Sequence, residues 1–475
     1  MTAAMQLEWN NDEIQKIWEA DKLGRMASAE KLTRIISSYN SLKVSDDEDK
    51  SLTLVVKSPW GTGKTYFVKK WMETLIEKGA FCVYFSAWEA EIHKTPATYF
   101  LQSFIEAFEA QPELHSKFDS LLKTKALKAL PIMLTIATIA CLPVGALYAF
   151  AAKLFTDEVA KKCTAALKRH DKKQSIEESA LPIKDAREHL GLLVDELAES
   201  SFENKVYVFI DELDRCKPDF AIKILEEIKH FFSLSNLVFI VSVDFNQLEG
   251  SIKHVYGSHI DCEGYLMRFV KLFYTLPELN HLQYARYLRT QLASAAENLI
   301  EVPVLEDGVD SSFEAIFASL SRTFNASLRD QQIIMTRLKL MLSAGKVFVF
   351  PTVYFMFIQL RFPAIWQQAM KDGVSILTPD YLIEHFKVIK ETPNTAPDNS
   401  FSLPPKHQNL LIDLIHFLSV ANDKATRAIK FDELKKGYAK RGERPEHDYL
   451  RMIGSEMKEF SSQTDLINLY SEGFK

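Results

Sequence analysis

The chain has 475 residues, of which 47% are hydrophobic and 25% charged, and its net charge is −6. This composition is typical of globular domains and excludes whole-chain disorder, a collagen-like repeat and a small disulfide-stabilised fold. The acidic balance gives no support for a chain-wide basic surface that binds nucleic acid. The five cysteines lie too far apart for a CxxC zinc site or a disulfide framework. We therefore expect a reducing, cytoplasmic compartment, and the acidic N-terminus does not resemble a secretory signal.

Apolar runs alternate with helical patterns through the first 277 residues. Apolar residues at helical spacing predict helix over residues 11–42. Five apolar runs predict strands at 52–58, 81–88, 206–211, 237–244 and 271–277, with those at 52–58, 206–211 and 237–244 expected to be buried. Helices are expected at 65–78 and 218–232 and through much of a large insert at 100–200. Strands that alternate with helices predict an α/β fold with a parallel sheet covered on both faces.

The pattern after Pro277 is mainly helical. It divides into a helical lid at 278–390, a proline-rich linker at 391–407 and a C-terminal helical region at 408–475. An apolar stretch near residue 350 is interrupted by Pro351 and Arg361, so core packing is expected rather than a membrane span. Basic residues of the C-terminal region are interleaved with acids, which indicates a solvated face or, alternatively, a partner surface.

The clearest motif is Ser58-Pro-Trp-Gly-Thr-Gly-Lys-Thr65, which follows a predicted strand and precedes a predicted helix. Backbone N–H groups of such a loop bind phosphate, and Gly61 and Gly63 permit the required angles. Lys64 is expected to reach the β- and γ-phosphates, and Thr65 to offer its hydroxyl to Mg²⁺. Ser58 replaces the first glycine of the pattern, so either the loop starts with ordinary angles or the site is weakened. The residues expected to contact nucleotide here are Ser58, Pro59, Trp60, Gly61, Thr62, Gly63, Lys64, Thr65 and Tyr66.

A second motif follows the predicted strand at 206–211. Asp211 and Glu212 stand at its carboxyl end, where open parallel sheets bind ligands. Asp211 is expected to hold Mg²⁺ through water, and Glu212 to orient or deprotonate the attacking water. A solvated acidic turn is the alternative interpretation. Both motifs together, in this order, predict a nucleoside triphosphatase.

Several segments together resemble the KAP family of P-loop NTPases over about residues 20–345. They are Asp21–Arg25, Trp60–Thr65, Phe85–Trp88, Asp211–Cys216 and Val243–Asp244. The resemblance implies a sheet of the additional-strand type, with order 5-1-4-3-2 and a helical lid. It also implies ATP rather than GTP as the nucleotide. Bacterial members often resemble parts of phage-defence or mobile-element systems.

The resemblance implies roles for residues outside the two motifs. Asp244 would sense the γ-phosphate or polarise water, unless it only caps the following helix. Arg268 stands where related ring NTPases place an arginine finger that acts across subunits, although a surface arginine is the alternative. Arg329 resembles a lid arginine that touches the nucleotide. Gly24 and Arg25 would line the adenine side.

Three residues close to the motifs are assigned less specifically. Asp214 and Arg215 would lie at a subunit boundary or pair with each other on the surface. Trp88 is expected in the core rather than as a platform for a base.

The most unusual segment is residues 129–152, which carry no charged side chain and have basic flanks. A single membrane crossing is excluded if the loop at 58–65 and the strand at 206–211 bind one nucleotide, because the crossing would separate them. The run is too short for two crossings. We expect a helical hairpin with an apolar tip. The tip would enter one leaflet of the membrane from its inner face, pack against another copy or a partner protein, or be buried in the protein's own core.

These observations favour a Mg²⁺-dependent ATPase whose nucleotide cycle drives oligomer assembly or the switching of a partner protein. A homo-oligomer and further protein components are expected, and nucleic acid is not indicated. The alternative is an ATP-bound scaffold or membrane-associated adaptor that hydrolyses poorly and positions partner proteins.

Overall fold

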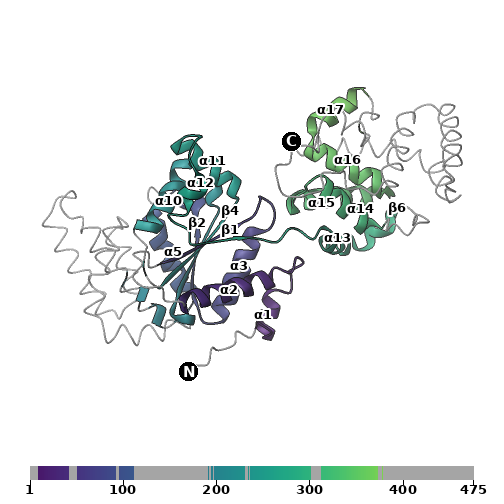
Figure 1. Ribbon diagram of the computed structural model, residues 1–475. Coiled ribbons are helices and arrows are strands. Elements are labelled where there is room, and N and C mark those ends of the chain that lie inside the picture. The colour runs from purple at the N-terminus through teal and green to yellow at the C-terminus, as the bar shows by residue number, and fades with distance from the viewer. Residues whose placement is uncertain are drawn as a thin grey trace, which may run out of the picture. The chain divides into compact units, whose positions relative to one another are not determined.

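A computed structural model describes residues 9–41, 51–92, 96–111, 201–230, 236–300 and 312–372, and isolated positions at 191–199, 234 and 377. The chain divides into two compact units, Met1–Pro277 and Glu278–Lys475, whose elements are labelled in Figure 1. The hairpin expected at 129–152, the linker at 391–407 and the region 408–475 lie outside the described residues. Within the described part of the chain, no helix is long and apolar enough to cross a membrane.

Five parallel strands form the sheet of the first unit, in the order β2-β3-β4-β1-β5. Read from β5, the strands follow as 5, 1, 4, 3 and 2. Every residue of β3 and β4 is buried, which explains why both read as continuous apolar runs rather than alternating ones. The strands are β1 (Leu52–Lys57), β2 (Phe81–Ser86), β3 (Val206–Asp211), β4 (Leu237–Val243) and β5 (Leu272–Thr275).

Helices from the N-terminal part cover one face of this sheet. Trp71 packs edge-on against Phe209 of β3, with ring centres 5.5 Å apart. Its indole N–H donates to Thr33 at 2.9 Å, and the Trp18 indole donates to Thr74 at 2.8 Å. These bonds satisfy the polar atoms of buried aromatic side chains and fix the helices to one another. The helices are α1 (Asp12–Ile17), α2 (Met26–Ser41) and α3 (Lys64–Glu77).

The continuous helix predicted over residues 11–42 is wrong, because the chain turns between α1 and α2. The Asp21 carboxylate accepts hydrogen bonds from the backbone N–H groups of Leu23 and Met26, at 3.1 and 2.9 Å. Gly24 adopts φ +66°, which only glycine tolerates freely. The turn starts α2 anew and brings Arg25 into the first unit's interior.

The opposite face of the sheet is covered by helices that follow β2, β3 and β4. Phe100 of α5 packs against Phe85 of β2 and Phe239 of β4, with ring centres 6.0 and 6.3 Å apart. Figure 1 shows α5 and α10 on this side and α2 and α3 on the other. The elements are α4 (Ala87–Ala90), α5 (Pro96–Ala110), the 3₁₀ turn η2 (Leu213–Arg215), α10 (Pro218–His230), α11 (Phe245–Tyr256) and α12 (Cys262–Leu266). The 3₁₀ turn η1 (Phe202–Asn204) precedes β3, and its Phe202 packs against the core on the side of α1 to α3.

The described part of the second unit is mainly helical. Phe324 stacks on Phe357 with ring centres 5.5 Å apart, and most of α16 is buried, so the expected core packing near residue 350 is confirmed. A two-stranded parallel pair, β6 with β7, was not expected from the sequence. The elements are α13 (His281–Thr290), η3 (Ala293–Asn298), β6 (Leu299–Ile300), α14 (Phe313–Thr323), α15 (Leu328–Ala344), β7 (Val347–Phe348), α16 (Val349–Arg361) and α17 (Pro363–Asp372).

Candidate functional site

The phosphate-binding loop joins β1 to α3 at the carboxyl edge of the sheet. Gly61 and Gly63 have φ of 76° and 90°, the left-handed region in which glycine is unstrained. Gly63 is the N-cap of α3, and no side chain caps the first turn of that helix. The first turn therefore presents backbone N–H groups and the positive end of the helix dipole, the combination that binds phosphate.

Ser58 starts this loop without a positive φ, so the first of the two alternatives for its backbone holds. Its backbone N–H donates to the carbonyl of Val243 at 3.1 Å, which continues the pairing of β1 with β4. Its hydroxyl lies 2.6 Å from the hydroxyl of Thr62, so a hydrogen bond joins the start of the loop to its later part. The serine is thus accommodated without backbone strain.

Lys64 is buried at the start of α3. Its ammonium group donates to the carbonyls of Ser58 and Pro59 at 2.8 and 3.1 Å and lies 3.7 Å from the carboxylate of Asp214. Burial lowers the pKa of Lys64, and the surrounding carboxylates oppose that change, in the order Asp214, Asp244, Asp211. The ammonium is the group that a bound phosphate would meet in the loop.

The carboxyl end of β3 supplies the acidic residues. The Asp211 carboxylate accepts a bond from the Tyr84 hydroxyl at 3.3 Å, and burial together with this carboxylate raises the pKa of Tyr84. Glu212 adopts a left-handed conformation, with φ 63°. Its two oxygens are engaged by the Ser86 hydroxyl and by Arg215, each at 3.0 Å. Because β2 and β3 are in register at Ser86 and Asp211, both strands deliver polar groups to one place.

Asp244 follows β4 and makes two kinds of contact. One carboxylate oxygen accepts from the backbone N–H of Asn246 at 3.1 Å and caps α11, as one alternative expected. The other accepts from the backbone N–H of Trp60 in the phosphate loop at 2.9 Å. The side chain therefore caps a helix and also contacts the nucleotide loop.

For Asp214, the predicted surface pair with Arg215 is wrong, and the alternative of a subunit boundary stays a prediction. Arg215 binds Glu212 instead. One oxygen of the buried Asp214 carboxylate accepts from the Trp60 indole at 2.6 Å and from the backbone N–H of Asp244 at 2.7 Å. The 3₁₀ turn η2 carries the residue from the strand end to this position. Its partners, Trp60 and Asp244, are distant in the sequence, so no local spacing marks this role.

Arg25 lies in the interior of the first unit with 3% of its surface exposed. Burial lowers the pKa of Arg25, and Asp21 and Tyr274 oppose the change. Within the described residues its buried Nη1 atom has no hydrogen-bond partner. Gly24 precedes it in the turn before α2, so the two residues expected on the adenine side stand together.

The other predicted residues are less constrained. Thr65 and Tyr66 are half-buried in the first turn of α3. Arg268 is exposed just after α12, with its guanidinium 5.9 Å from the centre of the Tyr265 ring. Arg329 is exposed on α15 of the second unit, and its role stays a prediction.

Trp88 does not pack in the core, so that prediction is wrong. Its side chain is 52% exposed on the short helix α4, and the guanidinium of Arg215 lies 5.7 Å from its ring centre. The stacked pair stands beside Glu212, since Arg215 also binds that carboxylate.

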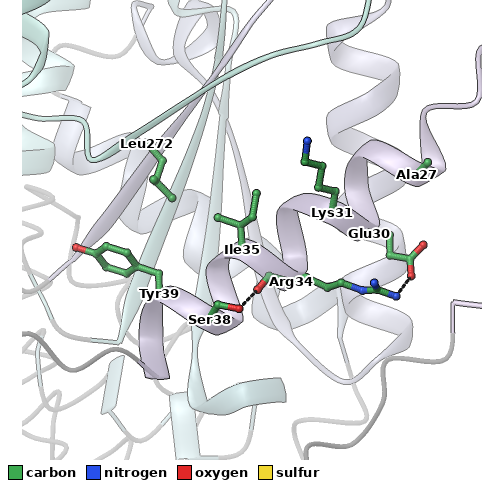
Figure 2. A pocket seen from close by; sticks show the side chains of 8 residues that line it. All are labelled: Ala27, Glu30, Lys31, Arg34, Ile35, Ser38, Tyr39 and Leu272. Carbon is green, nitrogen blue, oxygen red and sulfur yellow. Dashed lines mark hydrogen bonds and ion pairs between the residues drawn. The ribbon is translucent and has the colours of Figure 1, made fainter.

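A surface pocket of about 470 Å³ lies elsewhere, along α2 and the start of β5. Figure 2 shows Ile35 and Tyr39 near Leu272, with Arg34 turned toward Glu30. None of its lining residues belongs to the phosphate loop or to the acidic strand ends. They are Ala27, Glu30, Lys31, Arg34, Ile35, Ser38, Tyr39 and Leu272.

Comparison with known proteins gives one family match. The model of the KAP family P-loop domain matches residues 25–344. A search of the curated proteins finds no match. Among solved structures, PCH-2 of C. elegans is similar with a TM-score of 0.32 and 14% identity over 74% of this chain and 73% of its own. The ORC2 protein of Aeropyrum pernix, described with ADPNP and ADP, is similar with a TM-score of 0.31 and 14% identity over 84% and 94%. Similarity at this level does not bear on the activity of this chain.

Proposed function

Because the chain belongs to the KAP family of P-loop domains, we propose that it is a Mg²⁺-dependent ATPase whose cycle assembles or switches partner proteins. One observation carries the proposal. The buried ammonium of Lys64 lies in the phosphate loop with the carboxylates of Asp211, Asp214 and Asp244 around it. A cation held in a backbone anion cradle beside acidic strand ends is the arrangement that binds nucleotide phosphates and a metal ion.

The residues present fit a nucleoside triphosphate with Mg²⁺. The loop glycines have the required left-handed angles, and the first turn of α3 has no side-chain cap. Within the described residues, no group of three or more metal-binding side chains occurs. Mg²⁺ prefers one or two protein oxygens together with substrate phosphates, so Thr65 and Asp211 would suffice to hold it. The bound ion would neutralise charge on the phosphates.

The predicted site residues then take the following roles. Lys64 would exchange its bonds to the loop carbonyls for bonds to phosphate oxygens. Glu212 would orient the attacking water and accept its proton, which requires release of Ser86 or Arg215. Arg268 would complete the site of a neighbouring subunit, in keeping with its exposed position. Arg25, whose buried Nη1 atom has no hydrogen-bond partner among the residues that the structure describes, would face the base.

A second candidate function is a slowly hydrolysing, ATP-bound scaffold that positions other proteins. The specific observation in its favour is that both carboxylate oxygens of Glu212 are already engaged. With both oxygens of the general base engaged, ATP hydrolysis stays slow until a partner or a second subunit releases the carboxylate. The setting that the family resemblance implies, a multi-component bacterial system against phage, is compatible with either candidate.

ATP hydrolysis measured over a range of protein concentrations tests the proposal. The matched variants are Lys64→Ala with the exposed Lys69→Ala of the same helix, and Arg268→Ala with the exposed Arg34→Ala of α2. We expect turnover per chain to rise with concentration, to vanish in Lys64→Ala and to drop in Arg268→Ala, while both controls stay unchanged. If turnover per chain does not change with protein concentration and is unaffected by Arg268→Ala, Arg268 is not an arginine finger. Bound ATP without turnover would favour the scaffold.

A further inference from the structure

Asp214 has no step assigned to it in the activity proposed above, yet it joins three parts of the site. One of its oxygens lies 2.6 Å from the indole nitrogen of Trp60, 2.7 Å from the backbone nitrogen of Asp244 and 3.7 Å from the ammonium of Lys64. Only 3% of its side chain is exposed. A buried carboxylate is costly unless it is hydrogen-bonded, and here one oxygen accepts two such bonds and has the ammonium of Lys64 as its charge partner.

Hydrogen bonds connect Trp60 of the phosphate loop, Asp214 and Asp244 to one another. The backbone N–H of Trp60 donates to the Asp244 carboxylate, and the indole N–H of the same residue donates to Asp214. Asp214 in turn accepts from the backbone of Asp244. One loop residue is thus fixed at two points, one at the end of β4 and one in the turn after β3. Two anchors on one residue leave the loop little freedom to rotate.

The exposure of Trp60 supports a positioning function rather than core packing. Half of its surface is exposed, at 50%, so its ring contributes less apolar burial than the buried rings of Trp18 and Trp71. The indole N–H is the part of the side chain that makes the short bond. The residue is therefore placed by hydrogen bonding to Asp214 and not by the hydrophobic core.

We propose that Asp214 is a positioning residue that, through Trp60, holds the phosphate loop in one geometry ready to accept a nucleoside triphosphate. The use of that geometry rests on the proposed ATPase function, whereas the anchoring of the loop does not. Asp214 also balances the charge of Lys64 without a direct hydrogen bond to it. The ammonium is therefore free to transfer from the loop carbonyls to phosphate oxygens.

The first readout uses the protein without nucleotide. The fluorescence of Trp60 is obtained by subtracting the spectrum of Trp60→Phe from that of the wild type, and its quenching by iodide is measured. We expect Asp214→Ala to increase this quenching and to shift the emission to longer wavelength. Asp214→Asn keeps an oxygen acceptor for the indole, so it should retain the wild-type signal. Asp219→Asn, an exposed change on α10, is the control.

The second readout is the affinity for Mg·ATP. Loss of a hydrogen bond to a charged group predicts about a tenfold rise of Kd in Asp214→Ala. Because Asp214 acts through Trp60, the double variant with Trp60→Phe should bind no more than about twofold more weakly than the weaker single variant. Multiplicative losses, or an unchanged Trp60 signal in Asp214→Ala, would overturn the proposal.

The two proposals can fail separately. If the wild-type protein binds no nucleotide, the ATPase function is refuted, and the Trp60 signal still decides whether Asp214 anchors the loop. If Asp214→Ala does not fold, as judged by circular dichroism, Asp214→Asn and Trp60→Phe carry the test. In that case we expect Trp60→Phe to weaken nucleotide binding several-fold and Asp214→Asn to keep the Trp60 signal. Loss of that signal in a folded Asp214→Asn variant would contradict the anchoring role.

Discussion

The Glu212→Gln variant tests the assignment of the water-activating residue. The wild-type carboxylate accepts from Ser86 with one oxygen and pairs with Arg215 through the other, each at 3.0 Å. Glutamine is nearly the same size and keeps an oxygen for Ser86, but its NH₂ group faces Arg215 and removes the ion pair. The Arg215 side chain is 39% exposed and can turn into solvent. We therefore expect a loss of at most about 1 kcal/mol in the free energy of unfolding.

The effect on catalysis should be far larger than the effect on stability. An amide cannot accept the proton of water, and loss of general-base catalysis lowers rates about 10²- to 10⁴-fold. ATP affinity should stay within about threefold, because uniform ground-state binding does not involve this carboxylate. Single-turnover hydrolysis and equilibrium binding of the same preparation separate the two quantities. A rate reduced less than about tenfold, with binding intact, would show that Glu212 is not the base.

Three other expectations follow from the same groups of atoms. Arg215→Ala frees one oxygen of Glu212, so basal hydrolysis should rise about two- to fivefold, within the energy of a partly exposed ion pair; an unchanged rate would mean that the pair does not restrain the base. Burial, assisted by Arg322, lowers the pKa of His281 to about 4. Stability should therefore fall as pH drops from about 6.5 toward 4, by at most about 1.4 kcal/mol per unit, and His281→Gln should flatten that slope in denaturant titrations. Burial raises the pKa of Cys216 to about 12, so peptide mapping should find its thiol unmodified by iodoacetamide at neutral pH; rapid labelling would contradict the buried environment.

The sequence was most informative where one physical requirement dominates. The five strands were predicted because each is a short apolar run, and for β3 and β4, which are buried on both faces, such a run is the expected signal. The edge strand β5 alternates between half-buried and exposed residues. The phosphate loop was predicted because its chemistry demands glycines, lysine and threonine at fixed spacing. The break between α1 and α2 was missed, since apolar periodicity continues through it and only Asp21 and Gly24 mark the turn.

Residues whose role depends on tertiary geometry were harder to predict. Asp214 reads as one more polar residue of an acidic turn, and only the 3₁₀ conformation of η2 brings it to Trp60. Trp88 reads as core because large aromatic residues usually are, whereas α4 is too short to bury it. The two-residue strands β6 and β7 carry too few residues to form a pattern. In each case the deciding contact is distant in sequence.

The charge balance at the carboxyl edge of the sheet leads to a last prediction. Four carboxylates, those of Asp211, Glu212, Asp214 and Asp244, face two cations, Lys64 and Arg215. A triphosphate adds further negative charge to a site that is already acidic, and the buried location weakens the screening by water. We therefore expect EDTA to weaken ATP binding at least about tenfold, with added Mg²⁺ restoring it. Asp211→Asn removes one of these carboxylates. In this variant EDTA should therefore weaken ATP binding less than in the wild type, and turnover with Mg²⁺ should be lower. Equal ATP affinity with and without the ion, measured calorimetrically at constant ionic strength, would show that Lys64 and the loop amides alone outweigh the acidic strand ends.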